Sequence, residues 1–187
     1  MYKVIALIGE AGSGKDTLLQ EILKKEPKFH EVISFTTRPP REGEKEGKSY
    51  FFITSEKFAE KILNFEMFEI AFFNNWIYGI GKESIDEENI NITILNPDGV
   101  YMLLENPQVD LMIYYVRANP KTRLLRQLNR EENPDIDEII RRYKADLEDF
   151  SNLDFNYIAI ANENKEDLSN AADFIISHIN LWNSNGQ

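Results

Sequence analysis

Residues 4–17 read VIALIGEAGSGKDT, and this stretch decides the fold. Residues 4–8 are apolar and rich in β-branched side chains, which is typical of a strand buried within a parallel sheet. Glycines follow at positions 9, 12 and 14, and helical spacing begins near Thr17. A buried strand, a glycine-rich loop and a helix in that order predict a loop whose backbone N–H groups bind phosphate.

The loop matches the pattern G-x-x-x-x-G-K, which places a lysine where it reaches the β and γ phosphates of a nucleotide. We therefore expect this loop to bind ATP, with the residues Gly9, Glu10, Ala11, Gly12, Ser13, Gly14, Lys15, Asp16 and Thr17.

Asp16 stands where the pattern has a hydroxyl that binds Mg²⁺. An acidic residue in the first turn suits the helix dipole and needs no further role. Near a triphosphate the same charge is repelled unless a cation lies between them, so Asp16 is alternatively a residue that orders water on Mg²⁺. The adenylate kinase pattern lacks this hydroxyl and has Thr one residue later, as Thr17 does here. We expect Mg²⁺ to be held indirectly, through phosphates and water.

Length and composition set the class of protein. A chain of 187 residues predicts one domain. The formal net charge of -11 argues against nonspecific binding to nucleic acid or to an anionic membrane. No apolar run is long enough to span a bilayer and no signal peptide is recognised, so we expect a cytoplasmic protein. The absence of cysteine excludes disulfides and thiolate chemistry.

The arginines are confined to two short segments, although the lysines are scattered. Arginine binds phosphate through two parallel hydrogen bonds, so this confinement indicates a local anion site; solvated helix faces are the alternative. The two groups are Arg38 with Arg41, and Arg117, Arg123, Arg126, Arg130, Arg141 and Arg142.

Apolar runs alternate with helical patterns along the chain, which predicts an α/β fold with a central parallel sheet. The further strands are predicted at 32–35, 50–53, 67–73, 90–95, 111–116 and 157–161, and the helices at 17–25, 56–63, 100–105, 121–130, 136–150 and 165–182. Residues 34–78 break the alternation and predict a small mixed insertion. Residues 131–135 are polar, contain Pro134, and have the composition of a mobile lid.

The segment SFTTRPPREGEKEGKSYFF, followed by FEIAFFNNWIYG, resembles the acceptor region of guanylate kinases. The resemblance covers the chain from Lys3 to about Trp182. It implies a P-loop NTPase three-layer fold with a mixed α+β insertion and an arginine-bearing helical lid. We accordingly expect residues 1–187 to form one guanylate kinase-like domain. Its core is expected at 1–33 and 84–187, with the lid at about 126–142 and the insertion at about 34–83.

The resemblance also implies an acceptor site for GMP. Its phosphate-binding residues would be Arg38, Arg41, Tyr50 and Tyr78, whose guanidiniums and phenols donate the hydrogen bonds that a dianion needs. Ser34 and Glu69 would read the base, because one carboxylate accepts both adjacent donors of guanine. Asp98 falls where the family has an acidic pair beside base and metal, and Asn96 occupies the companion position.

Two departures from the family leave the choice of base open. The stretch NPDGV looks shorter than its family counterpart, and one hydroxyl is missing. The family has Ser or Thr after the tyrosine–glycine pair, whereas this chain has Ile80 after Tyr78 and Gly79. The acceptor pocket therefore lacks one hydroxyl. GMP is favoured, and dGMP or a broader range of deoxynucleotides is the alternative.

Three arginines of the second group, Arg123, Arg126 and Arg130, share one helix face because their spacing is i, i+3, i+7. Lys15, Arg126, Arg130 and Arg142 are the expected catalytic residues, since phosphoryl transfer needs alignment and positive charge more than a nucleophile. Arg123 is alternatively an exposed helix charge, and Arg141 is expected to face solvent.

The sequence thus predicts an ATP-dependent guanylate kinase, monomeric or homodimeric, with ATP and GMP or dGMP as its substrates. A nucleoside monophosphate kinase of other specificity is the first alternative. A noncatalytic guanylate kinase-like interaction domain is the second. It is disfavoured because the sequence retains Lys15, Arg38, Arg41 and Glu69.

Overall fold

The structure is a computed structural model that describes residues 1–40, 43–73, 75–130 and 132–184. It divides into two compact units. The first contains Met1–Ala6 and Phe29–Met112, and the second contains Leu7–Lys28 and the chain from Ile113 onward. Among the described residues, no helix is both long enough and apolar enough to cross a membrane.

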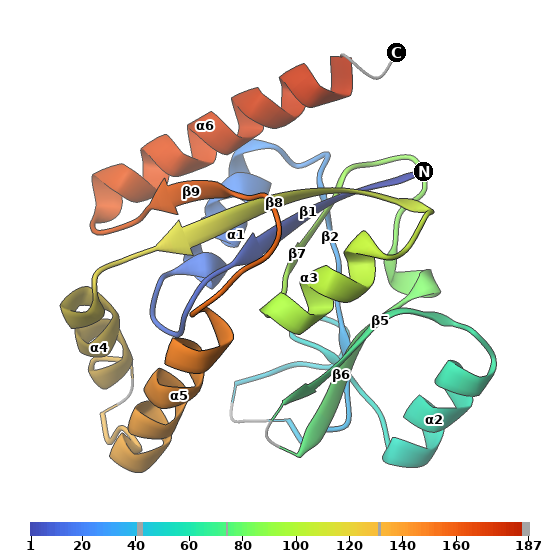
Figure 1. Cartoon of the computed structure of the whole chain (residues 1–187), viewed down its shortest axis with the longest axis horizontal. Helices are drawn as coiled ribbons and strands as arrows, with labels where there is room; N and C mark the ends of the chain where they lie inside the picture. The colour runs from blue at the N-terminus through green and yellow to red at the C-terminus, as the bar shows by residue number, and fades with distance from the viewer. Residues whose placement is uncertain (41–42, 74, 131, 185–187) are drawn as a thin grey trace. The chain divides into compact units, whose positions relative to one another are not determined.

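Within the described residues, strands and α-helices alternate along most of the chain (Figure 1). The strands are β1 (Tyr2–Ile8), β2 (His30–Glu31), β3 (Phe35–Thr36), β4 (Phe51–Phe52), β5 (Met67–Phe73), β6 (Trp76–Gly81), β7 (Asn91–Ile94), β8 (Val109–Arg117) and β9 (Ile158–Ala161). The helices are α1 (Lys15–Lys25), α2 (Ser55–Leu63), α3 (Pro97–Leu104), α4 (Pro120–Leu128), α5 (Ile136–Asp149) and α6 (Lys165–Ser184), and a short 3₁₀ turn spans Lys82–Ser84.

The central sheet has five strands in the order β2-β7-β1-β8-β9, and strand β2 pairs in parallel with β7, as β8 does with β9. Its middle strand is the apolar run that opens the chain. Residues 4–8 of β1 are at most 1% exposed, as expected for a strand covered on both faces. The predicted α/β fold with a central parallel sheet is therefore confirmed.

In the second unit, α1 packs against α6, and α6 also contacts β9 (Figure 1). The helices bury one face each, through Leu18 and Ile22 of α1 and Ile175 and Ile179 of α6, all fully buried. This apolar packing fixes the helix that follows the glycine-rich loop.

In the first unit, a second sheet has the order β4-β3-β6-β5 and is formed by residues 35–81. Helix α2 contacts β6, and α3 contacts β5. Phe58 of α2 is fully buried, and its ring tip lies 2.9 Å from where a Cβ on Gly79 would stand. The glycine therefore makes room for the aromatic ring.

Two predictions of local structure were wrong. The strand expected at 32–35 is divided, because β2 ends at Glu31 in the central sheet and β3 begins at Phe35 in the second sheet. Strand β6 was not predicted at all. It contains glycines at two of its six positions, and these weaken a strand pattern although here they permit close packing.

We expect Phe58→Ala to lower the free energy of unfolding by about 3–5 kcal/mol, because it removes a fully buried ring and leaves a cavity. Phe65→Ala is the matched control, since Phe65 is 81% exposed, and its effect should stay within about 0.5 kcal/mol. Urea unfolding of the three proteins provides the measurement. Equal losses for the two variants would contradict the assigned packing.

Candidate functional site

The glycine-rich loop joins β1 to α1 in the second unit. Gly12 and Gly14 adopt left-handed backbone conformations, with φ of 80° and 91°. A Cβ on Gly12 would stand 2.4 Å from the backbone oxygen of Arg123, and one on Gly14 would stand 2.4 Å from Nδ2 of Asn162. Both positions therefore require glycine for its conformation and for its size.

Lys15 begins α1, and its ammonium group folds back onto the loop. Nζ donates to the carbonyl oxygens of Gly9, at 2.6 Å, and Glu10, at 3.2 Å. Burial lowers the pKa of Lys15, and the nearby carboxylates of Asp16 and Asp146 oppose that shift. Asp16 and Thr17 follow in the first turn of α1, and both are exposed.

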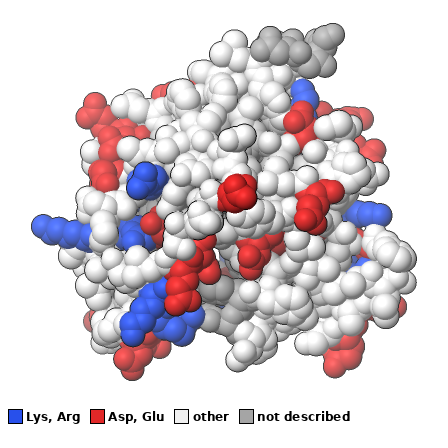
Figure 2. All heavy atoms as spheres, viewed as in Figure 1, with Lys and Arg blue, Asp and Glu red and all other residues white. Residues whose placement is uncertain are grey.

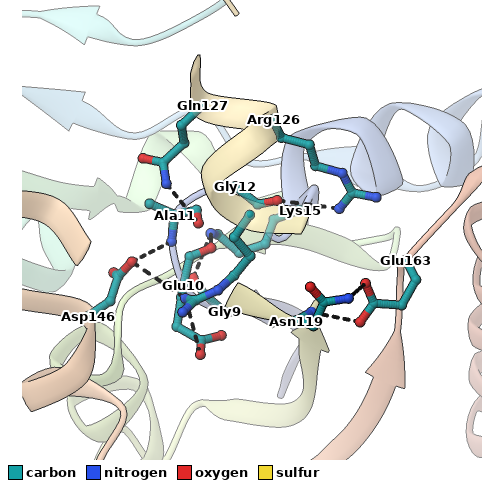
Figure 3. A network of polar contacts seen from close by, with 11 residues as sticks. Gly9, Glu10, Ala11, Gly12, Lys15, Asn119, Arg126, Gln127, Asp146 and Glu163 are labelled. Atoms are coloured by element: carbon teal, nitrogen blue, oxygen red, sulfur yellow. Dashed lines mark hydrogen bonds and ion pairs between the residues drawn. The ribbon is translucent and has the colours of Figure 1, made fainter. Parts of the chain in front are cut away.

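Side chains from other elements surround the loop (Figure 3). Nη1 of Arg126 donates to the carbonyls of Gly12 and Ser13, at 3.3 and 3.2 Å. Nδ2 of Asn162 donates to the Ser13 carbonyl at 2.8 Å. Helix α4 and the end of β9 thus both contact the loop whose backbone is predicted to bind phosphate.

Arg123 is not the exposed helix charge that the sequence left open. It is only 3% exposed, with Nη1 3.2 Å from Oε1 of Glu10 and 3.8 Å from Oδ2 of Asp146. Its guanidinium also lies over the ring of Tyr143, 5.3 Å from the centroid. The carboxylates of Glu10 and Asp146 offset the buried positive charge, which would be strongly unfavourable if it were unpaired.

The remaining arginines of the lid region differ in their surroundings. Arg141 and Arg142 both bind Glu138 one turn earlier on α5, with shortest distances of 2.6 and 2.7 Å. Hydrogen bonds from Arg141, together with those from Arg142, hold the pKa of Glu138 near 2. Arg130 is exposed. Figure 2 shows basic and acidic side chains adjacent over the part of this face where α5 lies.

The first unit contains a second cluster that combines an arginine with aromatic hydroxyls. Arg38 is 6% exposed and donates from Nη2 to both carboxylate oxygens of Glu44, at 2.7 and 2.9 Å. Its guanidinium lies 5.5 Å from the ring centroid of Tyr50, and the Tyr50 and Tyr78 rings are 5.8 Å apart. Arg41, expected to complete this group, lies outside the described residues.

Glu69 lies on β5 of the same sheet and is buried, at 3% exposure. Burial raises the pKa of Glu69 to about 8. A hydrogen bond from the backbone of Ile80 opposes this increase, whereas the negative charge of Asp98 adds to it. Its Oε1 lies 2.6 Å from where a Cβ on Gly99 would stand. The carboxylate therefore faces the first turn of α3, whose N-cap is Asn96.

Ile80, the departure from the family, and Ser34, an expected base contact, both belong to this sheet region. Ile80 pairs with Glu69 across β5 and β6 and is fully buried. Ser34 precedes β3, is partly exposed, and its carbonyl accepts from the backbone N–H of Phe51 at 2.9 Å. An apolar side chain thus lies beside the buried carboxylate, at the position where the resemblance implied a hydroxyl.

Sequence reasoning missed several residues that contact these clusters. Asp146 of α5 accepts from the backbone N–H of Ala11 at 2.7 Å, and Gln127 of α4 donates to the Ala11 carbonyl at 3.4 Å. Glu44 stands inside the quoted TTRPPREGE motif, which was a usable signal. No sequence signal pointed to Asp146, because an acidic residue in an amphipathic helix is common.

The strand, glycine-rich loop and helix, together with the parallel sheet around them, define a P-loop nucleotide-binding fold. A solved guanylate kinase from Anaplasma phagocytophilum superposes with a TM-score of 0.65 at 22% identity, covering 96% of this chain and 85% of that one. This likeness supports the fold.

Comparison with sequence families gives the closer assignment. The family model described as Guanylate kinase matches residues 1–178. A guanylate kinase from Thermotoga maritima is 30% identical over 180 residues, which is 94% of this chain and 84% of that protein. The chain therefore belongs to the guanylate kinase family.

Other relatives match over a smaller share of their length. A guanylate kinase from Nostoc sp. is 42% identical over 83 residues, which is 44% of this chain and 42% of that protein. One from Mycoplasma mycoides subsp. mycoides SC is 33% identical over 169 residues, which is 87% of this chain and 56% of that protein. The matches thus span about half the length of these curated relatives.

The buried carboxyl of Glu69 predicts a specific dependence of stability on pH. Its folded pKa of about 8 lies above the ordinary value of 4.5, so the folded state retains a proton that the unfolded state releases. Stability from this group is complete below pH 4.5 and is lost as the pH rises through 8.

We expect Glu69→Gln to remove this loss, so that the variant gains stability relative to wild type between pH 5 and pH 9. Glu60→Gln, on the exposed face of α2, is the control and should follow the wild type. Thermal unfolding across that pH range measures the difference. A constant difference between Glu69→Gln and wild type would show that the carboxyl does not titrate in this way.

Proposed function

We propose that the chain is an ATP-dependent guanylate kinase that transfers the γ-phosphoryl group of ATP directly to GMP or dGMP. The observation that carries the proposal is Glu69. A buried carboxylate on the same small sheet as an arginine–tyrosine cluster supports recognition of a base and a phosphate of one nucleotide. The glycine-rich loop would bind the other nucleotide.

In the acceptor site, Arg38, Tyr50 and Tyr78 would donate hydrogen bonds to the phosphate of GMP. Arg38 now binds Glu44, so the acceptor phosphate would replace a carboxylate that already satisfies the guanidinium. Ionised Glu69 would accept from the two adjacent donors of guanine, with Ser34 and Asp98 beside it. Arg41 belongs to the proposal, although it lies outside the described residues.

In the donor site, the backbone N–H groups of residues 9–17 and the ammonium of Lys15 would bind the ATP phosphates. Lys15 would exchange its two carbonyl partners for phosphate oxygens. Arg126, Arg130 and Arg142 would add positive charge around the transferred group. Closure of the lid region at about 126–142 would exclude water and suppress hydrolysis of ATP.

The protein residues fit a Mg²⁺ ion that arrives with the nucleotide. Within the described part of the chain, no group of three or more His, Cys, Asp or Glu side chains is arranged to hold a metal. Mg²⁺ is commonly held by one or two carboxylates together with substrate phosphates and water. Asp16, Thr17 and Asp98 are the residues proposed to bind its water. The ion would neutralise phosphate charge.

Ile80 supports a second candidate function, a nucleoside monophosphate kinase with broader specificity. Its buried apolar side chain beside Glu69 supplies no hydrogen bond to a base. A site with fewer polar contacts rejects an incorrect nucleotide less strongly.

A coupled ADP-release assay with ATP and each common nucleoside monophosphate tests the choice between these functions. We expect GMP or dGMP to give the highest kcat/KM, and AMP and dTMP to be poor substrates because they lack the paired donors that Glu69 accepts. Faster turnover of AMP or dTMP than of GMP would reject the guanylate kinase assignment.

Lys15→Ala should reduce kcat by about 10³-fold or more while the protein remains folded, because the ammonium is the loop's cationic contact with the transferred phosphoryl group. Lys24→Ala is the control, since Lys24 lies on the same helix but is exposed. Its kcat should match the wild type. Steady-state kinetics and circular dichroism provide both readouts, and near-normal turnover by Lys15→Ala would refute the role of Lys15.

A further inference from the structure

The phosphate-binding loop already has a carboxylate on one of its backbone donors. Oδ2 of Asp146, from α5, accepts the backbone N–H of Ala11 at 2.7 Å (Figure 3). A carboxylate and a phosphate oxygen are both anionic acceptors, and backbone N–H groups of such loops bind either. Asp146 therefore occupies a donor of the kind that a phosphate would use.

Charges of both signs surround this bond. Lys15 interacts with the carboxylates of Asp16, Asp146 and Glu10 and with the neighbouring cation Arg123, and Asp146 interacts with both cations. A triphosphate would bring several negative charges into this group. Because like charges repel strongly where burial limits screening, the triphosphate and Asp146 would compete for the same positive charge.

Among the described residues, several buried polar atoms beside the bond make no hydrogen bond, although Nη1 of Arg123 lies within ion-pair distance of Glu10. Within the described residues, Nε and Nη1 of Arg123, Oε2 of Glu10 and Oγ of Ser13 are buried without a hydrogen bond. Leaving such groups unsatisfied is energetically unfavourable. The cluster thus gains hydrogen bonds if an additional acceptor enters or if its carboxylates move.

We propose that Asp146 is an internal competitor for the phosphate groups of the donor nucleotide. In the unliganded chain it holds the Ala11 N–H and ties α5 to the loop. Binding of the triphosphate displaces it and releases that tie. This inference rests on the proposed function, in which the loop binds ATP.

The displacement would connect the donor site to the lid region. Helix α5 begins directly after the polar segment that was predicted to be mobile, and it carries Arg142 four residues before Asp146. Arg142 is held by Glu138 of the same helix, so it moves with α5 rather than with the loop. Release of Asp146 would therefore free the helix that carries a proposed phosphate contact.

The test is calorimetric titration of ATP and of adenosine into wild type, Asp146→Asn and Glu148→Gln. Removal of the competing charge should tighten ATP binding by about fivefold or more, a modest share of one close charge–charge interaction. Adenosine, which lacks phosphate, should bind all three proteins equally. Glu148 is exposed two residues later on α5, and its variant should bind ATP as the wild type does.

A purely structural role for Asp146 predicts the opposite sign. If the carboxylate only braces the loop, Asp146→Asn and Asp146→Ala should bind ATP more weakly or equally, and either result would overturn the proposal. A crystal structure of the wild type with a nonhydrolysable ATP analogue is a second test that needs no variant. Retention of the 2.7 Å bond between Asp146 and Ala11 beside a bound triphosphate would also overturn it.

The same titrations separate this inference from the proposed function. If the wild type does not bind ATP, the proposed donor site itself is refuted. If the wild type binds ATP and phosphorylates GMP, but Asp146→Asn binds ATP no more tightly, only the role proposed for Asp146 is refuted.

Discussion

The second unit depends on one buried guanidinium. Arg123 lies between Glu10 of the glycine-rich loop and Asp146 of α5, while its own backbone packs against Gly12. Helices α4 and α5 are thereby held to a loop that contains no apolar side chain larger than Ala11. Charge, rather than apolar area, fixes the geometry here. Such an arrangement is sensitive to any new charge, because buried ion pairs gain little once their desolvation is counted.

The two proposed nucleotide sites are built on different physical principles. The loop would bind phosphate through backbone groups, so its sequence requirement is mainly for glycines that permit the necessary conformations. The proposed acceptor site is built from side chains in and beside a small sheet, with Arg38 and Glu69 both almost completely buried. Burial of either charged group is unfavourable, and the unliganded protein offsets this in a different way for each. Arg38 has a carboxylate partner, whereas Glu69 has a raised pKa.

Much of the fold and of the candidate site could be predicted from local sequence. The apolar run before Gly9, the glycine spacing and the helix that follows are all local signals, and β1 and α1 form where they indicate. Strand β5 likewise has the predicted limits. By contrast, β6 and the division between β2 and β3 depend on which strands pair with each other. Local patterns in a single sequence do not reveal that pairing. Tertiary packing also decides the burial of Arg123, for which the sequence left an exposed helix charge open as an alternative.

Glu44 and Asp146 are two residues that sequence reasoning missed. Both are ordinary acidic residues by composition, and each becomes informative only when its partner is known, Arg38 in one case and the Ala11 N–H in the other. Ile80 is the reverse case. Its identity was visible at once, but its significance depends on the finding that it is buried next to Glu69.

The hydrogen-bond partners of Lys15 affect which substitutions near it the chain can tolerate. Its ammonium rests on the main-chain oxygens of Gly9 and Glu10, and a main-chain oxygen is supplied by every amino acid. Replacement of the Glu10 side chain therefore leaves that resting position available.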